Sequence, residues 1–240
     1  MRFAVIDIET RIDKRLVREV FFPAALDEEQ AYLQMREQLG GGFFPVSLHV
    51  PIVIAWGEVD ADHVLESVQT LTAGTGGEES LIGEFWQRAE RFNGCLVTFN
   101  GRRFDLPVLE LHALRWGLSA PLHFAHRQSG TGEHHLDLMD FISNGGAFSL
   151  RGGLDLLLKT IGLPGKGPIH GAQVQELYDS GRLPEIESYC RDDVIQTFFL
   201  FLRTQLLRGH LDHGQYRRAW ESSARFLAQI GAPSALRSAP

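Results

Sequence analysis

Cysteine is nearly absent from this sequence: only Cys95 and Cys190 occur among 240 residues, and they form no C-x-x-C pair. A disulfide framework needs several cysteines and a zinc knuckle needs clustered ones, so the sequence argues against both. Histidine does not replace them, because the His134-His135 pair has no second cluster with zinc-ligand spacing. We therefore expect a protein of the reducing cytoplasm without structural zinc.

Long apolar runs are also missing. Carboxylates at Asp7 and Glu9 interrupt the first segment before the apolar core of a signal peptide could form. The most apolar late stretch, Phe198 to Leu202, is far shorter than the roughly 20 residues that a membrane-spanning helix needs. The sequence therefore predicts neither export nor a membrane span.

Positive charge is scarce, with 23 Lys and Arg against 30 Asp and Glu and a net charge of -7. This balance argues against a protein that coats long nucleic acid through a broad basic surface, because that affinity comes from many contacts between basic side chains and phosphates. A nuclease acting on a short end needs few such contacts, and bound metal ions neutralise its acids. The 44% hydrophobic content suits one large domain, which we place at residues 1–230 with a flexible tail at 231–240.

The stretch from Arg2 to Thr10 is an apolar, β-branched run that ends in two carboxylates, and it predicts a buried strand. Side chains two apart on a strand point the same way, so Asp7 and Glu9 share one face at its end. Like charges this close are costly unless a cation lies between them. Two interpretations remain open: a divalent metal site at the mouth of a sheet, or a strand that has reached the surface.

Residues 11–50 separate this strand from the next one, predicted at Val50 to Val59. Asp27 and Gln30 have the spacing of a capping box for a helix up to Leu39. Aromatic residues argue against disorder in this insertion; they are Phe21, Phe22, Phe43 and Phe44. The insertion is either a flap beside the first motif or a satellite that packs on the domain.

A second candidate region follows the compact strand predicted from Cys95 to Phe99. A polar loop leads from this strand into a helix that carries Asp105 at its start, which is where α/β sheets place ligand contacts. Asp105 is alternatively an ordinary acid favoured by the helix dipole. Farther on, Asp137 is predicted to cap the turn after a short edge strand.

A late helix that begins near Pro184 holds the third candidate region. Tyr189 and Asp193 are four residues apart and therefore share one face, beside the apolar stripe that docks on the sheet. An acid on this inward flank needs a partner, and a metal ion shared with Asp7 and Glu9 would provide one.

In chain order, the three motifs are Asp7-x-Glu9, Asn100-x-x-x-Phe104-Asp105 and Tyr189-x-x-x-Asp193. Together they resemble the DEDDy subgroup of the DnaQ-like 3'-5' exonucleases, and the second motif is similar to that of the family B DNA polymerase proofreading domain. The resemblance covers roughly Met1 to Leu206 and points to the stand-alone, polymerase-B-like predicted exonucleases. It implies an α/β, RNase H-like fold with a mixed five-stranded sheet flanked by helices. The insertion and the lack of a polymerase domain depart from the proofreading enzymes.

The resemblance also implies two Mg²⁺ or Mn²⁺ ions, which can activate water, stabilise charge on phosphorus and assist the departing oxygen. Asp7 would bridge both ions, Glu9 and Asp193 would complete the first, and Asp105 would anchor the second. Tyr189 would orient the attacking water, since a phenol ordinarily titrates near pH 10 and is a poor base at neutral pH.

Four residues are candidates for substrate contact. Asn100 and Phe104 would meet the terminal nucleotide, by hydrogen bonding and by packing. Arg103 and Lys166 would meet phosphates, although Lys166 lies in a glycine-rich loop where a solvated lysine is the more common explanation. That loop is no Walker loop, because Gly167 replaces the Ser or Thr that would hold magnesium.

We expect a nucleic-acid partner, single-stranded DNA 3' ends, and no membrane partner. An exoribonuclease of the same fold remains an alternative, because metal chemistry at phosphate does not depend on the sugar. A non-catalytic module that binds nucleic acid or protein is a second alternative. It would have no reason to keep costly clustered carboxylates.

Overall fold

The computed structural model describes residues 1–22, 26–129, 134–165, 167 and 170–232. Its centre is a sheet of five strands: β1 (Arg2–Ile12), β2 (His49–Val59), β3 (Leu65–Thr72), β4 (Gly94–Thr98) and β5 (His135–Asp137). The strand order is β3-β2-β1-β4-β5; β1 is antiparallel to β2 and parallel to β4. The predicted mixed five-stranded sheet is therefore confirmed.

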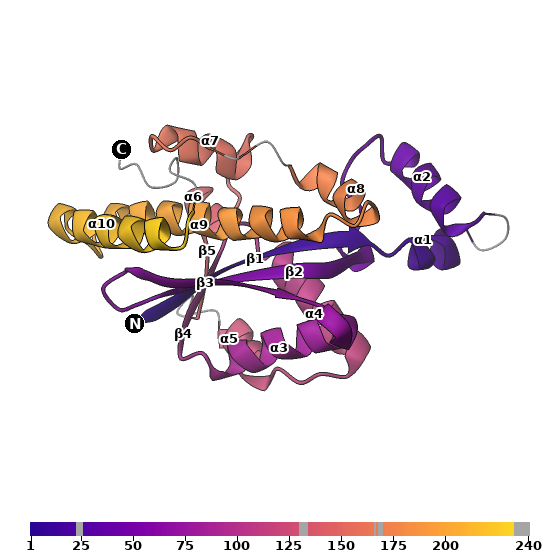
Figure 1. Ribbon diagram of the computed structural model, residues 1–240, viewed down its shortest axis with the longest axis horizontal. Helices are drawn as coiled ribbons and strands as arrows, with labels where there is room; N and C mark the ends of the chain where they lie inside the picture. Colours follow the sequence, from indigo (N-terminus) through magenta and orange to yellow (C-terminus); the bar gives the residue numbers. More distant parts are fainter. Residues whose placement is uncertain (23–25, 130–133, 166, 168–169, 233–240) are drawn as a thin grey trace.

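Helices cover both faces of the sheet (Figure 1). One face carries α6 (Leu138–Ile142), α7 (Gly153–Thr160), α8 (Val174–Asp179), α9 (Leu183–Leu207) and α10 (His213–Gln229). The other carries α3 (Gly77–Arg91), α4 (Asp105–Trp116) and α5 (Pro121–Ser129). Short 3₁₀ turns lie at Val46–Leu48, Gly74–Gly76 and Gly171–Gln173. Among the described residues, no helix has the length and apolar character needed to cross a bilayer.

The alternation of β1 divides the core into two layers. Ala4, Ile6 and Ile8 pack with α3 and α4, whereas Val5 packs on the opposite face with α9. Because the period of a strand is two, the side chains of Asp7 and Glu9 continue the Val5 face. The two acids of the first motif therefore point toward the layer that contains α9.

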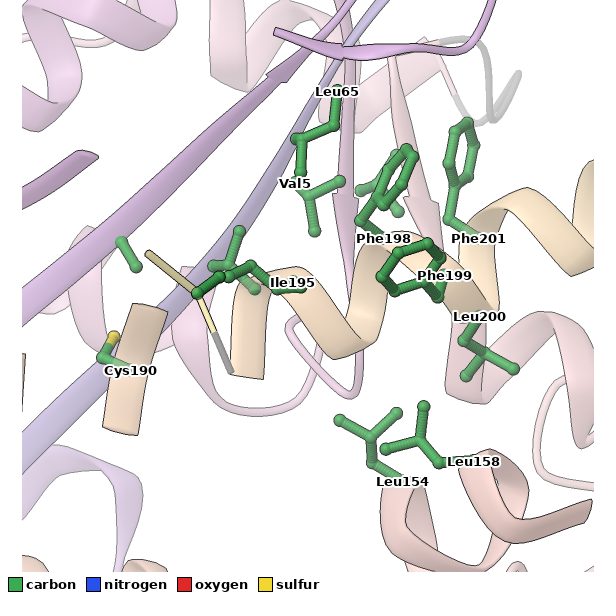
Figure 2. Close-up of a cluster of buried hydrophobic side chains, with 14 of the residues drawn as sticks. Val5, Leu65, Leu154, Leu158, Cys190, Ile195, Phe198, Phe199, Leu200 and Phe201 are labelled. Carbon is green, nitrogen blue, oxygen red and sulfur yellow. The ribbon is translucent and has the colours of Figure 1, made fainter. Parts of the chain in front are cut away.

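Helix α9 is the most deeply buried helix of that layer. Phe198, Phe199 and Phe201 are fully buried, and Figure 2 shows them beside Val5 and Leu65 of the sheet. Burial of one such side chain stabilises the fold by about 1.5–3 kcal/mol. This packing fixes α9 over β1 and β2 and so determines where the polar start of the helix lies.

The insertion forms a helical unit at one end of the sheet, with α1 (Lys14–Phe21) and α2 (Glu28–Gln38) (Figure 1). Its described part has a small core of its own: Ile12, Val17, Ala31, Tyr32, Met35, Phe44 and Leu48. The predicted capping box of Asp27 and Gln30 is confirmed. Two features were not predicted: β1 extends to Ile12, and α1 follows at once with Asp13 as its cap.

Two helices have less obvious sequence signals. Helix α7 begins at Gly153, where Gly152 and Gly153 adopt left-handed φ of 93° and 52°. Helix α5 was not predicted from the sequence. Most of the tail predicted at 231–240 lies outside the described residues, so this boundary and the single-domain assignment stay predictions.

Candidate active site

Three carboxylates converge where β1 passes under α9. The ligand atoms of Asp7, Glu9 and Asp193 all lie within 4.8 Å of one another. Glu9 is 8% exposed and Asp193 is 4% exposed, so water screens their charges poorly. The strand period places the first two acids, and the packing of α9 places the third. Like charges held this close in a buried setting favour a bound cation.

The first turns of α9 add two further groups. Tyr189 is buried and lies one helical turn before Asp193. The Cys190 thiol lies 3.5 Å from both the backbone oxygen and the Oδ2 atom of Asp7, close enough to donate a weak hydrogen bond. Burial, with the nearby Asp7 carboxylate, raises the pKa of the Cys190 thiol well above its usual value. The thiol is therefore neutral and supports Asp7 as a donor; sequence reasoning missed this contact.

Asp105 reaches the same region from the second motif, as the first residue of α4. Strand β4 pairs with β1 only as far as Val5, which leaves the backbone N–H of Ile8 unpaired on that edge. This N–H donates to Asp105 Oδ1 at 3.1 Å. The fourth acid is thereby held against the residue between Asp7 and Glu9.

The electrostatics of Asp105 reflect its depth, since the residue is only 4% exposed. Burial raises the pKa of Asp105 to about 7, the backbone N–H of Ile8 opposes that rise, and the carboxylates of Asp137 and Asp193 add to it. Asp105 is thus electrostatically coupled to the three-acid cluster, although its oxygens are not among those within 4.8 Å of one another.

A buried carboxylate shapes the loop before Asp105. Asp137 accepts hydrogen bonds from the backbone N–H groups of Asn100 at 3.0 Å and Arg102 at 2.8 Å. It also caps α6, as predicted, through the N–H of Met139. Its action on the second motif was not foreseen, because no local pattern links residues 37 positions apart.

The tight turn of this loop requires its Asn-Gly sequence. Asn100 has φ of 68°, a left-handed conformation that asparagine tolerates better than most residues. A Cβ atom at Gly101 would lie 2.5 Å from the side chain of Thr98, so only glycine fits there.

The predicted substrate contacts occupy different places. Asn100 is partly exposed in the turn, and Phe104 is partly buried between the α4 layer and the insertion. The Arg103 side chain is 58% exposed, with its guanidinium 3.6 Å from Asp140. Lys166 lies outside the described residues.

The donor set fits a hard divalent cation. Carboxylate oxygens are the ligands that Mg²⁺ and Mn²⁺ prefer, whereas zinc sites usually include nitrogen or sulfur. Three such oxygen ligands are already within reach of one ion, and Asp105 is adjacent. A cavity of about 410 Å³ between α3, α4 and α5 is separate from this cluster, since none of the four acids lines it.

Two solved structures are similar to this chain in fold. A family B DNA polymerase from the hyperthermophilic archaeon Pyrobaculum calidifontis aligns with a TM-score of 0.56 and 15% identity, over 97% of this chain and 30% of the polymerase. E. coli Exonuclease I in complex with a dT13 oligonucleotide aligns with a TM-score of 0.44 and 13% identity, over 92% and 50% of the two chains. The protein thus spans at most half the length of these two relatives. No curated protein sequence matches it.

The sequence itself carries a family assignment. Residues 41–237 match a family model described as a predicted 3'-5' exonuclease related to the exonuclease domain of PolB. This match covers most of the chain and includes the second and third motifs, while the polymerase structure shares the fold of the whole. The chain therefore belongs to the family of predicted 3'-5' exonucleases related to the exonuclease domain of PolB.

Proposed function

We propose that this protein is a metal-dependent 3'-5' exonuclease that hydrolyses phosphodiester bonds at the 3' ends of single-stranded DNA with two Mg²⁺ or Mn²⁺ ions. The observation that carries the proposal is the convergence of Asp7, Glu9 and Asp193, with ligand atoms within 4.8 Å of one another. Asp105 stands beside them, tied to the same strand through Ile8.

Each side chain has a distinct task in this reaction. Asp7, Glu9 and Asp193 would hold one ion, and Asp7 with Asp105 the other. When bound, such ions supply a nucleophilic water and stabilise charge on phosphorus and on the leaving oxygen. Tyr189 orients the water through its hydroxyl group, because it lies one turn before Asp193 on the same face of α9. Cys190 holds the Asp7 carboxylate in place through its thiol.

The choice of substrate follows from charge and from family. The chain has 23 Lys and Arg against 30 Asp and Glu, and Arg102 and Arg103 both pair with Asp140, so we infer that only a short strand segment is held. Few contacts mean frequent release, and therefore low processivity. An unpaired 3' end also avoids the cost of melting a base pair. The relation to the exonuclease domain of PolB favours DNA over RNA.

One assay tests the proposal. The purified protein is given single-stranded DNA labelled at its 5' end, matched RNA, a duplex and a circular strand, each with Mg²⁺, Mn²⁺ or a chelator. We expect a ladder of shortened products from linear single-stranded DNA, produced only with metal. The Asp193→Asn variant should be inactive while folded.

Several outcomes would contradict parts of this proposal. Cleavage of the circular strand would exclude an exonuclease, and early loss of the 5' label would reverse the polarity. Faster digestion of matched RNA would support the exoribonuclease alternative. Binding without hydrolysis in every metal would support a non-catalytic module. Near-native hydrolysis by folded Asp193→Asn would show that the acids are assigned wrongly.

A further inference from the structure

Three aromatic rings from distant parts of the chain meet beside the second motif. Phe43 comes from the insertion, His49 begins β2, and Phe104 directly precedes Asp105. The Phe43 and His49 rings are stacked, with centroids 4.7 Å apart and an interplanar angle of 17°. Phe104 meets both rings edge-on, at 5.2 Å from Phe43 and 4.9 Å from His49. We call these three residues the aromatic platform.

Hydrogen bonds fix the middle ring of the aromatic platform. A backbone carbonyl only accepts, so His49 Nε2 donates to the oxygen of Phe44 at 3.3 Å. His49 Nδ1 then accepts from the hydroxyl of Thr10 at 2.7 Å. His112 of α4 donates to the backbone oxygen of His49 at 2.8 Å. The ring and main chain of His49 are thus held by the acid-bearing strand and by the helix that starts at Asp105.

The outer ring of the aromatic platform is open to solvent. Phe43 is 68% exposed, although other aromatic residues of the insertion are buried, such as Phe44 at 8% and Tyr32 at 6%. A single exposed phenylalanine needs no explanation. Phe43 differs because its ring contacts two other rings, one of which belongs to Phe104, the residue directly before Asp105.

Single-stranded nucleic acid is commonly bound by such surfaces. Bases stack on exposed aromatic rings, and the interaction tolerates any sequence because every base has a π face. The Phe43 ring offers an uncharged aromatic face of this kind, since it is 68% exposed. Stacking adds affinity that does not come from basic residues, which suits a chain of net charge -7.

We propose that the aromatic platform, with Phe43 as its exposed member, stacks an unpaired base at or next to the 3' end of the substrate strand. The insertion thereby contributes a substrate-positioning residue to the exonuclease site. This inference rests on the proposed function, because it needs a nucleic-acid strand at the four acids. It assigns a task to the insertion that neither the acids nor Tyr189 perform.

Kinetics of Phe43 variants test the inference. Phe43→Ala should raise KM for single-stranded DNA roughly 5- to 150-fold, the range of one base stack, while kcat changes by less than about 3-fold. Phe43→Tyr should retain a near-native KM, whereas Phe43→Leu should behave like alanine, because it keeps apolar bulk but lacks a ring. Phe21→Ala is the matched control: it removes a 49% exposed phenylalanine from α1 of the same insertion and should leave KM unchanged.

A binding assay separates this inference from the proposed function. Asp193→Asn protein is mixed with an oligothymidylate that carries 2-aminopurine at one of the last three positions of its 3' end. Stacking should quench the fluorescence at one position at least, and Asp193→Asn/Phe43→Ala should abolish that quenching. For the wild type, a strand with abasic terminal nucleotides should show the higher KM of Phe43→Ala.

The outcomes are distinct. If the wild type hydrolyses DNA but Phe43→Ala keeps the native KM, or the quenching survives without Phe43, the platform inference fails and the proposed function stands. If no strand is hydrolysed but Phe43-dependent quenching occurs, the proposed function fails and the stacking surface stands. If neither hydrolysis nor quenching occurs, both are overturned.

Discussion

At the scale of single residues, the hydroxyl of Tyr189 is the one group of the proposed site whose removal should spare the metal. Tyr189→Phe keeps the buried ring, so Mn²⁺ affinity measured by calorimetry should be unchanged. The maximal rate should fall by about 10²- to 10⁴-fold, as expected for a group that positions a water or a proton. Tyr178→Phe, on the partly exposed Tyr178 of α8, is the control and should be silent. Loss of Mn²⁺ binding in Tyr189→Phe would make Tyr189 structural.

Charge repulsion among the acids gives a prediction about stability. Without metal, Asp193→Asn removes one of three carboxylates whose ligand atoms lie within 4.8 Å, so the melting temperature should rise by a few degrees. Mn²⁺ should raise the melting temperature of the wild type more than that of this variant. Glu84→Gln, on the exposed face of α3, should leave the metal response intact. An equal metal response in wild type and Asp193→Asn would place the ion elsewhere.

The two thiols should be inert while the protein is folded. Burial raises the pKa of Cys95 to about 11, and burial beside Asp7 raises the pKa of Cys190 well above its usual value. Thiolate is the reactive form, so an aromatic disulfide reagent at about pH 8 should label neither residue in the native state and both in denaturant. Rapid native labelling of either thiol, detected by mass spectrometry, would contradict the burial of that residue.

The sequence predicts the parts of the site that are built from residues close together along the chain, and it misses the parts built from distant residues. The shared face of Asp7 and Glu9 follows from the strand period alone, and that of Tyr189 and Asp193 from the helix period. The placement of Asp105 does not, because it depends on where β4 stops pairing with β1. The hydrogen bonds from Asp137 to the loop before Asp105 also join residues far apart in sequence. The sequence around Asp137 therefore predicted only its role as a helix cap.

At the scale of elements, the loop that precedes α4 depends on one carboxylate. Asp137→Asn replaces one carboxylate oxygen, which accepts a hydrogen bond from a backbone N–H group, by an NH₂ group, which can only donate. A backbone N–H group of the loop then loses its hydrogen-bond partner. We expect a loss of about 1–3 kcal/mol in unfolding free energy and a lower turnover, because the loop delivers Asp105. Asp140→Asn, which breaks only pairs with exposed arginines, is the control and should cost less than about 1 kcal/mol. Equal losses of stability in the two variants would contradict the conclusion that the Asp137 carboxylate holds this loop.

The elements that were predicted contain apolar stretches or a capping motif, whereas two short helices were missed. Strands β1, β2 and β4 are compact apolar runs, and α9 combines many apolar residues with a length of 25 residues. Helix α1 was missed because its sequence is dominated by charge and it buries only Val17 in a small separate core. Helix α5 was missed because its histidines and its initial proline are typical of a loop. The Glu90 carboxylate accepts hydrogen bonds from the first free N–H groups of this helix and so stabilises its start.

At the scale of the whole molecule, the fold of a polymerase domain occurs here in a chain that covers 30% of the polymerase relative. The proposed capture of a strand end draws on the four acids and on the aromatic platform. The helical insertion packs at the acid-bearing end of β1 and adds surface there.

The response of stability to pH is a property of the whole chain, and buried histidines contribute to it. Burial lowers the pKa of His135 to about 4, below the ordinary value of 6.5 that applies to the unfolded chain. Between these values the unfolded state binds more protons, so the contribution of His135 is complete above pH 6.5 and is lost as the pH falls toward 4. Asp105 changes stability in the opposite direction. Its pKa is raised to about 7 in the folded state, so the folded state binds more protons than the unfolded state and the contribution of Asp105 falls as the pH rises toward 7.

A difference measurement isolates the histidine. The unfolding free energy of the wild type minus that of His135→Gln should shrink by roughly 2 kcal/mol between about pH 7 and about pH 5, because the variant lacks the group that titrates. Urea unfolding at several pH values in metal-free buffer supplies both curves, and Asp105 cancels because it is present in both proteins. A constant difference across this range would mean that His135 titrates alike in the folded and unfolded chains. Its contact with Thr98 at the partly buried edge of the sheet would then open readily in the native state.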